Sequence, residues 1–89
     1  MPNDKDTNQE FHLTIVDPDK VIFEDNVKRI IAPGSIQDIA ILPDHTPLYS
    51  DLKAGEIEIT SINDKIEKIP IDSGVIRVRR NKVSIIVGF

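Results

Sequence analysis

Apolar and polar residues alternate over several short stretches of this chain, beginning with Phe11, Leu13 and Ile15. A period of two places every second side chain on the same face, which is typical of a strand with one buried and one exposed face. Glu56 to Thr60 shows the same alternation. The pattern predicts strands at 11–15, 21–23, 27–32, 36–42, 56–60, 65–71, 75–78 and 83–87, with a polar break at 24–26.

Turn-forming residues occupy the joints between these stretches. They stand at 17–20, 33–35, 63–64, 72–74 and 80–81. Pro70 has no N–H to donate to a neighbouring strand, so its strand is predicted to lie at a sheet edge or at a bulge. No stretch shows the three-four apolar spacing of an amphipathic helix. The predicted fold class is therefore all-β, as a sandwich or a barrel.

Composition narrows the class of protein further. The 89 residues are enough for one domain, predicted at residues 11–89 after a disordered tail at residues 1–10. The chain has no cysteine, which excludes thiolate catalysis and zinc–thiolate sites. Its formal charge of −4 disfavours binding to duplex nucleic acid. No apolar stretch approaches the ~20 residues that span a bilayer, so membrane association is expected only through a protein partner.

The segment AILPDHTPLY, residues 40–49, contains the clearest candidate for chemistry, His45. A catalytic histidine needs a reacting atom within reach and usually an orienting carboxylate. Asp44, Ser50 and Asp51 are close in sequence. However, Asp44 and His45 point to opposite faces if the chain is extended, and no oxyanion loop accompanies them. His12 is the only other imidazole, which leaves a metal site short of ligands. We expect no catalytic, cofactor-binding or metal site, and we interpret His45 as structural or as a partner contact.

A group of acidic residues could suggest acid–base chemistry. It consists of Asp17, Asp19, Glu24 and Asp25. Without a deep pocket or an apolar environment to shift their pKa values, such residues are more often solvated turn residues. They also lack the loop spacing and central glycine of an EF-hand. We therefore interpret them as turn residues.

A basic group flanks the last predicted hairpin. It consists of Arg77, Arg79, Arg80 and Lys82, and we call it the basic stripe. In a strand, Arg77 and Arg79 share one face. The stripe fits a solvated strand face or an acidic protein partner, and it fits a nucleic acid less well because no aromatic residues interleave it. The four glycines are scattered, so no phosphate-binding glycine loop is predicted.

Three segments carry a more specific signal when they are taken in order. They are LTIVDPDKVIFEDNVKRIIAPGS, ILPDHTPLYSDLKAGEIEI and DSGVIRVRRNKVSIIV. Together they resemble the N-terminal β-sandwich domain of the epsilon subunit of F-type ATP synthases, from about Leu13 to Val87. The anchor is the segment Ile41 to Leu48, where the family reads I-L-P-G-H-A-P-L. Ala32-Pro33-Gly34 before it and Leu52-Lys53-Ala54-Gly55 after it make the ordered match specific.

This resemblance implies a flattened sandwich of about ten short, mostly antiparallel strands in two sheets. It also implies a non-catalytic rotor subunit that packs on the gamma subunit and rests on the polar loops of the c-ring. Such a subunit couples proton or sodium flow to ATP synthesis as a peripheral part of a membrane complex, here expected at the cytoplasmic face of a bacterial cell membrane. The residues expected to contact gamma or the ring are Asp38, Pro43, Asp44, His45, Pro47 and Leu48.

The chain departs from the family pattern at three positions where relatives prefer glycine, namely Gln37, Ala40 and Asp44. A non-glycine residue is strained wherever such a position requires positive φ. Longer epsilon subunits continue into a two-helix domain that restrains rotation, so the end at Phe89 predicts a short form without epsilon-type inhibition. The alternative function is a ligand-binding or hydrolytic β module, which would need a concave pocket around His45 with converging polar groups.

Overall fold

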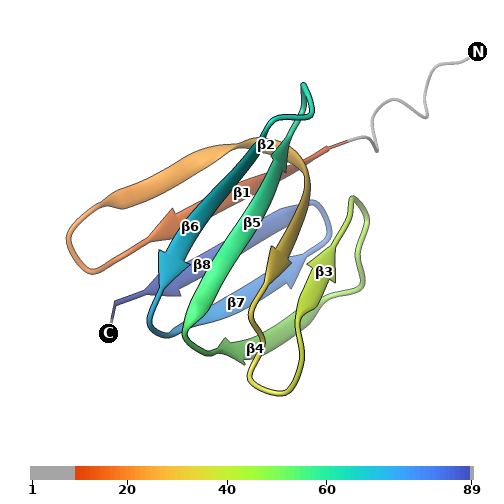
Figure 1. Ribbon diagram of the computed structural model, residues 1–89. Coiled ribbons are helices and arrows are strands. Elements are labelled where there is room, and N and C mark those ends of the chain that lie inside the picture. Colours follow the sequence, from red (N-terminus) through yellow and green to blue (C-terminus); the bar gives the residue numbers. More distant parts are fainter. Residues whose placement is uncertain (1–9, 89) are drawn as a thin grey trace, which may run out of the picture.

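The strands of the computed structural model define an all-β domain over the described residues, 10–88 (Figure 1). The predicted tail at 1–10 lies outside this range except for Glu10. Eight strands follow one another in that range, and none of these residues is helical. The strands are β1 (Phe11–Val16), β2 (Val21–Ala32), β3 (Ile39–Ile41), β4 (Leu48–Leu52), β5 (Gly55–Ser61), β6 (Ile66–Ile71), β7 (Gly74–Arg79) and β8 (Lys82–Val87). The predicted all-β class is confirmed.

Hydrogen bonding joins the eight strands into one curled sheet of order β4-β7-β8-β1-β2-β5-β6, with β3 added beside β2. Every pairing is antiparallel except that of β1 with β8, which agrees with a mostly antiparallel fold. The sheet folds over so that β5 and β6 lie over β7 and β8 (Figure 1). The two layers of the predicted sandwich are therefore continuous through β1 and β2, and the strands number eight rather than about ten.

Strand β2 is continuous where the sequence predicted a polar break at 24–26. Its first part, from Val21 to Val27, pairs with β1, and its second part pairs with β5 and β3. Glu24, Asp25 and Asn26 are all exposed, so this part of the ladder has no buried face to reveal it in the sequence. Backbone hydrogen bonds form regardless of side-chain polarity, and they keep the segment extended.

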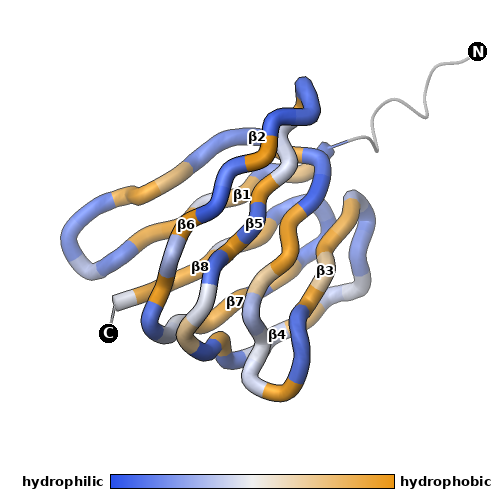
Figure 2. The backbone as a smooth tube through the Cα atoms, in the orientation of Figure 1, coloured by the Kyte–Doolittle hydropathy of each residue, from blue (hydrophilic) through white to orange (hydrophobic). Residues whose placement is uncertain are grey.

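The core lies between the two layers and is almost entirely aliphatic. Along β1, β5, β7 and β8, every second side chain points into the core. This alternation is visible as alternating colours along the tube in Figure 2. The most completely buried large side chains are Leu13, Ile15, Ile30, Ile41, Ile57, Ile59, Ile76 and Ile85. No polar or charged residue in the described range is buried, so burial of apolar area is the main stabilising contribution.

The predicted turns are present at the joints between the strands. Asp17 Oδ1 accepts hydrogen bonds from the backbone N–H groups of Asp19 at 2.7 Å and Lys20 at 2.8 Å. These two hydrogen bonds lower the pKa of Asp17, because they stabilise the carboxylate. Asp64 and Arg80 take the positive φ values of 68° and 51° that tight hairpins require.

Two short edge elements differ from the sequence prediction. The strand predicted at 36–42 contracts to β3, because residues 35–38 form an exposed loop. Strand β4 was not predicted, and it pairs with β7 at one edge of the sheet. Strand β6, which contains Pro70, forms the opposite edge, and this confirms the edge position expected for that proline.

The core assignment predicts different responses from two isoleucines. Ile30 is fully buried, whereas Ile66 is 62% exposed on the edge strand β6. Ile30→Val should lower the free energy of unfolding by about 0.5–1.5 kcal/mol. Ile66→Val should change it by less than about 0.5 kcal/mol. Urea titrations of both variants measure this difference, and equal losses would contradict the assignment.

Candidate partner-contact site

The residues predicted to contact a partner occupy both ends of the short strand β3. Asp38 precedes β3, whereas Pro43, Asp44, His45 and Pro47 belong to the connection from β3 to β4. Leu48 is the first residue of β4 and is half-buried against the core. A three-residue strand separates Asp38 from the others by roughly 10 Å of backbone. The structure therefore groups five of the six residues and places Asp38 on a second, neighbouring loop.

The β3–β4 connection, residues 42–47, is held to a distant turn by one hydrogen bond. The Asp44 N–H donates to Asn81 Oδ1 at 2.8 Å, and Asn81 lies in the turn between β7 and β8. Asp44 itself has a φ of 63°. Gln37 and Ala40 do not have positive φ, so only one of the three positions at which relatives prefer glycine is strained here. The prolines, Pro43 and Pro47, further restrict the backbone of this connection.

His45 is half-buried and makes its hydrogen bond inside this connection. Its Nδ1 lies 2.6 Å from the carbonyl oxygen of Thr46. A carbonyl only accepts, so Nδ1 carries a proton and donates it. Within residues 10–88, no hydroxyl or carboxylate forms a hydrogen bond with the His45 ring, and His45 does not line a surface hollow there. The geometry agrees with a shape-holding residue and lacks the converging polar groups that the hydrolytic alternative requires.

The second loop, residues 34–38, is fixed at its base and exposed at its tip. Lys53 N–H donates to the Pro33 carbonyl oxygen at 2.8 Å, and Gly34 forms a bridge with Leu52. A Cβ at Gly34 would collide with the carbonyl oxygen of Gln37, which explains the glycine. A shallow hollow lies between this loop and β4.

Large apolar side chains are exposed around both loops. Ile36 is 94% exposed, Tyr49 is 71% exposed and Leu42 is 54% exposed. Ile36 lines the hollow beside Leu48 and Ser50, whereas Tyr49 lies on the other face of β4, beside Arg77. Exposed apolar side chains beside anchored loops are suited to contact with another protein. Asp38, also exposed, adds a carboxylate to the loop that carries Ile36.

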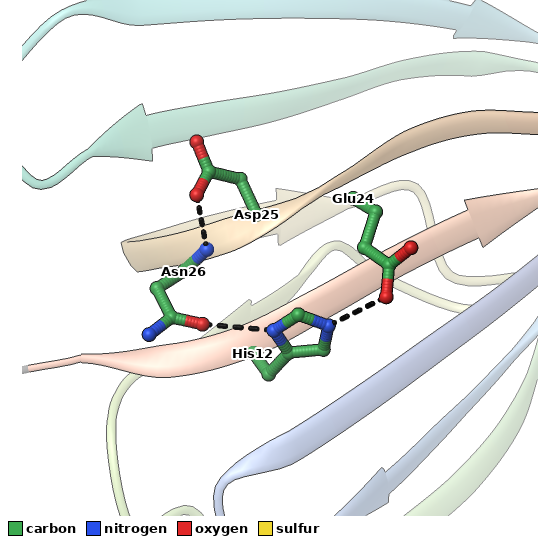
Figure 3. Close-up of polar contacts among 4 residues, drawn as sticks. All are labelled: His12, Glu24, Asp25 and Asn26. Atoms are coloured by element: carbon green, nitrogen blue, oxygen red, sulfur yellow. Dashed lines mark hydrogen bonds and ion pairs between the residues drawn. The ribbon is translucent and has the colours of Figure 1, made fainter.

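A polar cluster on β1 and β2 was not predicted from the sequence (Figure 3). His12 Nδ1 lies 2.8 Å from Asn26 Oδ1, and His12 Nε2 lies 2.9 Å from Glu24 Oε2. Asn26 Nδ2 donates to Glu10 Oε1 at 2.7 Å, which leaves Oδ1 to face the ring. Only the strand register reveals this cluster, since it pairs His12 with Asn26 and brings Glu24 within reach.

Both nitrogens of His12 face hydrogen-bond acceptors, so the protonated imidazolium is the form that satisfies both contacts. The hydrogen bond with Asn26 raises the pKa of His12 most, and the hydrogen bond with Glu24 raises it further. Partial burial and the positive charge of Lys82 oppose this rise. The pKa of His12 therefore lies above its ordinary value.

Within residues 10–88, no three side chains of the metal-binding types gather into a group that could hold a metal ion. The same range contains no helix with the length and apolar character needed to cross a membrane.

The family model described as ATP synthase, Delta/Epsilon chain, beta-sandwich domain matches residues 10–88. Among curated proteins, the ATP synthase epsilon chain of Campylobacter fetus is 36% identical over 76 residues, covering 85% of this chain and 59% of the relative. The epsilon chain of Desulfitobacterium hafniense is 37% identical over 76 residues, covering 85% of this chain and 57% of the relative. The chain thus spans somewhat more than half the length of these relatives.

Solved structures show the same fold. One is a chain of the Euglena gracilis mitochondrial ATP synthase, described as OSCP/F1/c-ring, with a TM-score of 0.84 at 21% identity. It is matched over 89% of this chain and 51% of that chain. A second, from the Tetrahymena thermophila mitochondrial ATP synthase central stalk and c-ring, has a TM-score of 0.73 at 19% identity, over 92% of this chain and 66% of that chain.

The positive φ of Asp44 predicts opposite effects of two substitutions. Asp44→Gly should leave the free energy of unfolding unchanged or raise it by up to about 1 kcal/mol, because glycine adopts this backbone without strain. Asp44→Ala should lower it by about 1 kcal/mol, because a Cβ is disfavoured there and alanine offers no local hydrogen bond. Chemical denaturation of both variants measures the order, and an alanine variant at least as stable as the glycine variant would refute the strained turn.

The His12 cluster predicts a pH-dependent contribution to stability. Because the folded pKa exceeds the unfolded value of about 6.5, the contribution is complete below pH 6.5 and is lost as pH rises through the folded pKa. Both side chains of the pair are exposed, so the contribution should be only about 0.2–1 kcal/mol. Between pH 5.5 and pH 8.5, the free energy of unfolding should fall further in the wild type than in His12→Gln, and the difference between the two falls should equal this contribution. Identical pH profiles would contradict it.

Proposed function

Because this chain belongs to the family of ATP synthase delta/epsilon chains, whose beta-sandwich domain matches residues 10–88, we propose that it is a non-catalytic subunit of an F-type ATP synthase rotor. In this role it bridges the gamma subunit and the c-ring, so that proton or sodium flow through the ring drives ATP synthesis. The family match over almost the whole chain carries the proposal. The 34–38 loop and the β3–β4 connection, with the exposed apolar residues beside them, support it.

The β3–β4 connection suits a contact that transmits torque. Its backbone is restricted by Pro43 and Pro47 and tied to Asn81 through the Asp44 N–H. A connection that is already ordered loses little conformational freedom on docking, so more of the contact energy remains as affinity. We propose that Pro43, Asp44, His45, Pro47 and Leu48 contact gamma, with His45 holding the shape of the connection through Thr46.

Asp38 takes a different part in this proposal. It lies on the 34–38 loop beyond the opposite end of β3 and is exposed. We propose that its carboxylate pairs with a basic group on a polar loop of the c-ring. An exposed pair of this kind contributes about 0.2–1 kcal/mol, so it sets the register of the contact more than its strength.

In this proposal, the location of the chain in the cell follows from its place in the ATP synthase complex. The chain is a peripheral component at the cytoplasmic face of an energy-transducing membrane, where gamma and the ring hold it. Curated relatives from bacteria such as Campylobacter fetus and Desulfitobacterium hafniense favour a bacterial cell membrane.

Assembly with gamma tests the proposal directly. A tagged chain should retain the cognate gamma subunit, and the mixture should elute earlier than either component on a sizing column. Pro47→Gly should weaken this association by about two- to fivefold, because it restores freedom to the connection without removing a polar contact. Asp19→Ala, in the turn between β1 and β2, serves as the control and should have no effect.

Failure of the chain to associate with cognate gamma would count against the rotor function. Equal effects of Pro47→Gly and Asp19→Ala would instead contradict the role given to the β3–β4 connection.

A further inference from the structure

The register of the sheet lines up three basic side chains on its outer face. Arg79 on β7 pairs with Lys82 on β8, and Lys82 pairs with His12 on β1. The strand neighbours of these residues are buried, namely Val78 before Arg79, Val83 after Lys82, and Phe11 and Leu13 on either side of His12, so the three side chains point away from the core. Paired residues on neighbouring strands lie about 5 Å apart, so this row brings three basic groups within roughly 10 Å.

The turn between β7 and β8 adds a fourth basic group and fixes the row. Arg80 lies in this turn with a φ of 51°. The His12 N–H donates to the Asn81 carbonyl oxygen at 2.9 Å, which ties the turn to β1. Asn81 Oδ1 accepts the Asp44 N–H, so the side-chain nitrogen Nδ2 of Asn81 remains available as a donor.

Three of these basic groups, Arg79, Arg80 and Lys82, lack acidic partners within residues 10–88, although the protein as a whole is acidic. The chain carries a formal charge of −4. Yet within residues 10–88 no carboxylate lies within 4.0 Å of the charged groups of Arg79, Arg80 or Lys82, and the ion pairs there involve His12, Lys20 and Lys28. Like charges at this spacing repel one another, and an anion bound among them would remove that repulsion.

A hollow opens among these side chains, and its lining determines the kind of ligand. His12, Arg79, Arg80, Asn81 and Lys82 line it, and we call it the basic hollow. A protein-binding surface has an apolar or aromatic centre, and a single-stranded nucleic acid needs aromatic platforms. This lining has no aliphatic, Phe, Tyr or Trp residue, and the ring of its one histidine, His12, is held by Asn26 and Glu24. Guanidinium groups match the oxygens of phosphate in a fork geometry, and an ammonium group adds a point charge.

We propose that the basic hollow binds a phosphate or diphosphate group, carried by a small molecule or by a lipid headgroup. Arg79 and Arg80 supply the forked donors, Lys82 supplies charge, and Asn81 donates from the turn. His12 lies at the rim and is already engaged by Glu24, whose carboxylate opposes the anion. The lining of this site contains none of the residues proposed to contact gamma or the c-ring, although Asn81 also accepts the Asp44 N–H of the β3–β4 connection.

Titration of the full chain with pyrophosphate at pH 7 tests the proposal. Amide resonances should shift at residues 79–82 and at His12, with little change on β5 and β6. Arg79→Gln together with Lys82→Gln should weaken binding at least tenfold. Glu24→Gln should strengthen it, because it removes the nearby negative charge. Lys68→Gln on β6 changes the net charge without touching the basic hollow, and it should leave binding unchanged.

Several outcomes would overturn the proposal. They are no resonance shift with millimolar pyrophosphate, an equal loss of binding in Lys68→Gln, or binding of poly-glutamate without binding of pyrophosphate. The last result would identify an acidic protein segment as the ligand. The unfolding transitions of the Lys68→Gln variant and of the Arg79→Gln, Lys82→Gln variant should match that of the wild type, because these positions are exposed. Glu24→Gln should lose only the small contribution of its pair with His12.

Sedimentation with vesicles distinguishes the two sources of phosphate. Vesicles of phosphatidylglycerol that retain the wild type but not the Arg79→Gln, Lys82→Gln variant would identify a lipid headgroup, with phosphatidylcholine vesicles as the neutral control. Pyrophosphate binding without vesicle retention would identify a soluble phosphate. Both results support a phosphate site, and retention on phosphatidylglycerol that is equal in the two proteins and occurs without pyrophosphate binding would contradict it.

Discussion

Strand β2 changes its hydrogen-bonding partners at Val27, and the two layers of the domain depend on that change. Val27 pairs with Phe11 on β1 and with Ser61 on β5, and its side chain is fully buried. Before it, β2 belongs with β1 and β8, and after it, β2 belongs with β5 and β3. A bulge lies between Val27 and Arg29 in the pairing with β5. Bulges bend and twist a strand, so this one allows the sheet to fold over its own core.

The folded-over sheet brings together segments that are distant in the sequence. The turn between β7 and β8 reaches the β3–β4 connection through the Asn81 side chain and β1 through the Asn81 carbonyl oxygen. One asparagine thus links the connection proposed to contact gamma to the turn that borders the basic hollow. The residues proposed to contact gamma and the c-ring lie on loops that the strands hold in place. Their side chains contribute shape and charge to the proposed contact.

The sequence was most informative where alternation was strict. The strands at Phe11, Gly55, Gly74 and Lys82 follow that signal because each has one face in the core. Prediction failed where a strand lacks a buried face, as in the exposed part of β2, or lies at an edge next to a proline, as in β4. It also failed for residues 36–38, whose apolar Ile36 points to solvent. Local signals could not reveal these outcomes because pairing decides them.

The candidate site also combines features that the sequence predicted with features that it could not predict. The sequence left two roles for His45, structural or partner contact, and its hydrogen bond with Thr46 agrees with the structural one. The anchor at Asn81 and the cluster of His12 with Glu24 could not be predicted, because each joins residues that only the register brings together. The family resemblance supplied the partners, which remain proposals, and the register supplied the basic hollow.

Amide hydrogen exchange of the chain, alone and with cognate gamma, tests the central claim most directly. The claim is that an already ordered β3–β4 connection docks on gamma without a change of fold. It predicts slower exchange on binding at residues 44–49, with unchanged exchange in β5 and β6. Unaltered exchange at residues 44–49 in the bound chain, or altered exchange throughout the sheet, would contradict it.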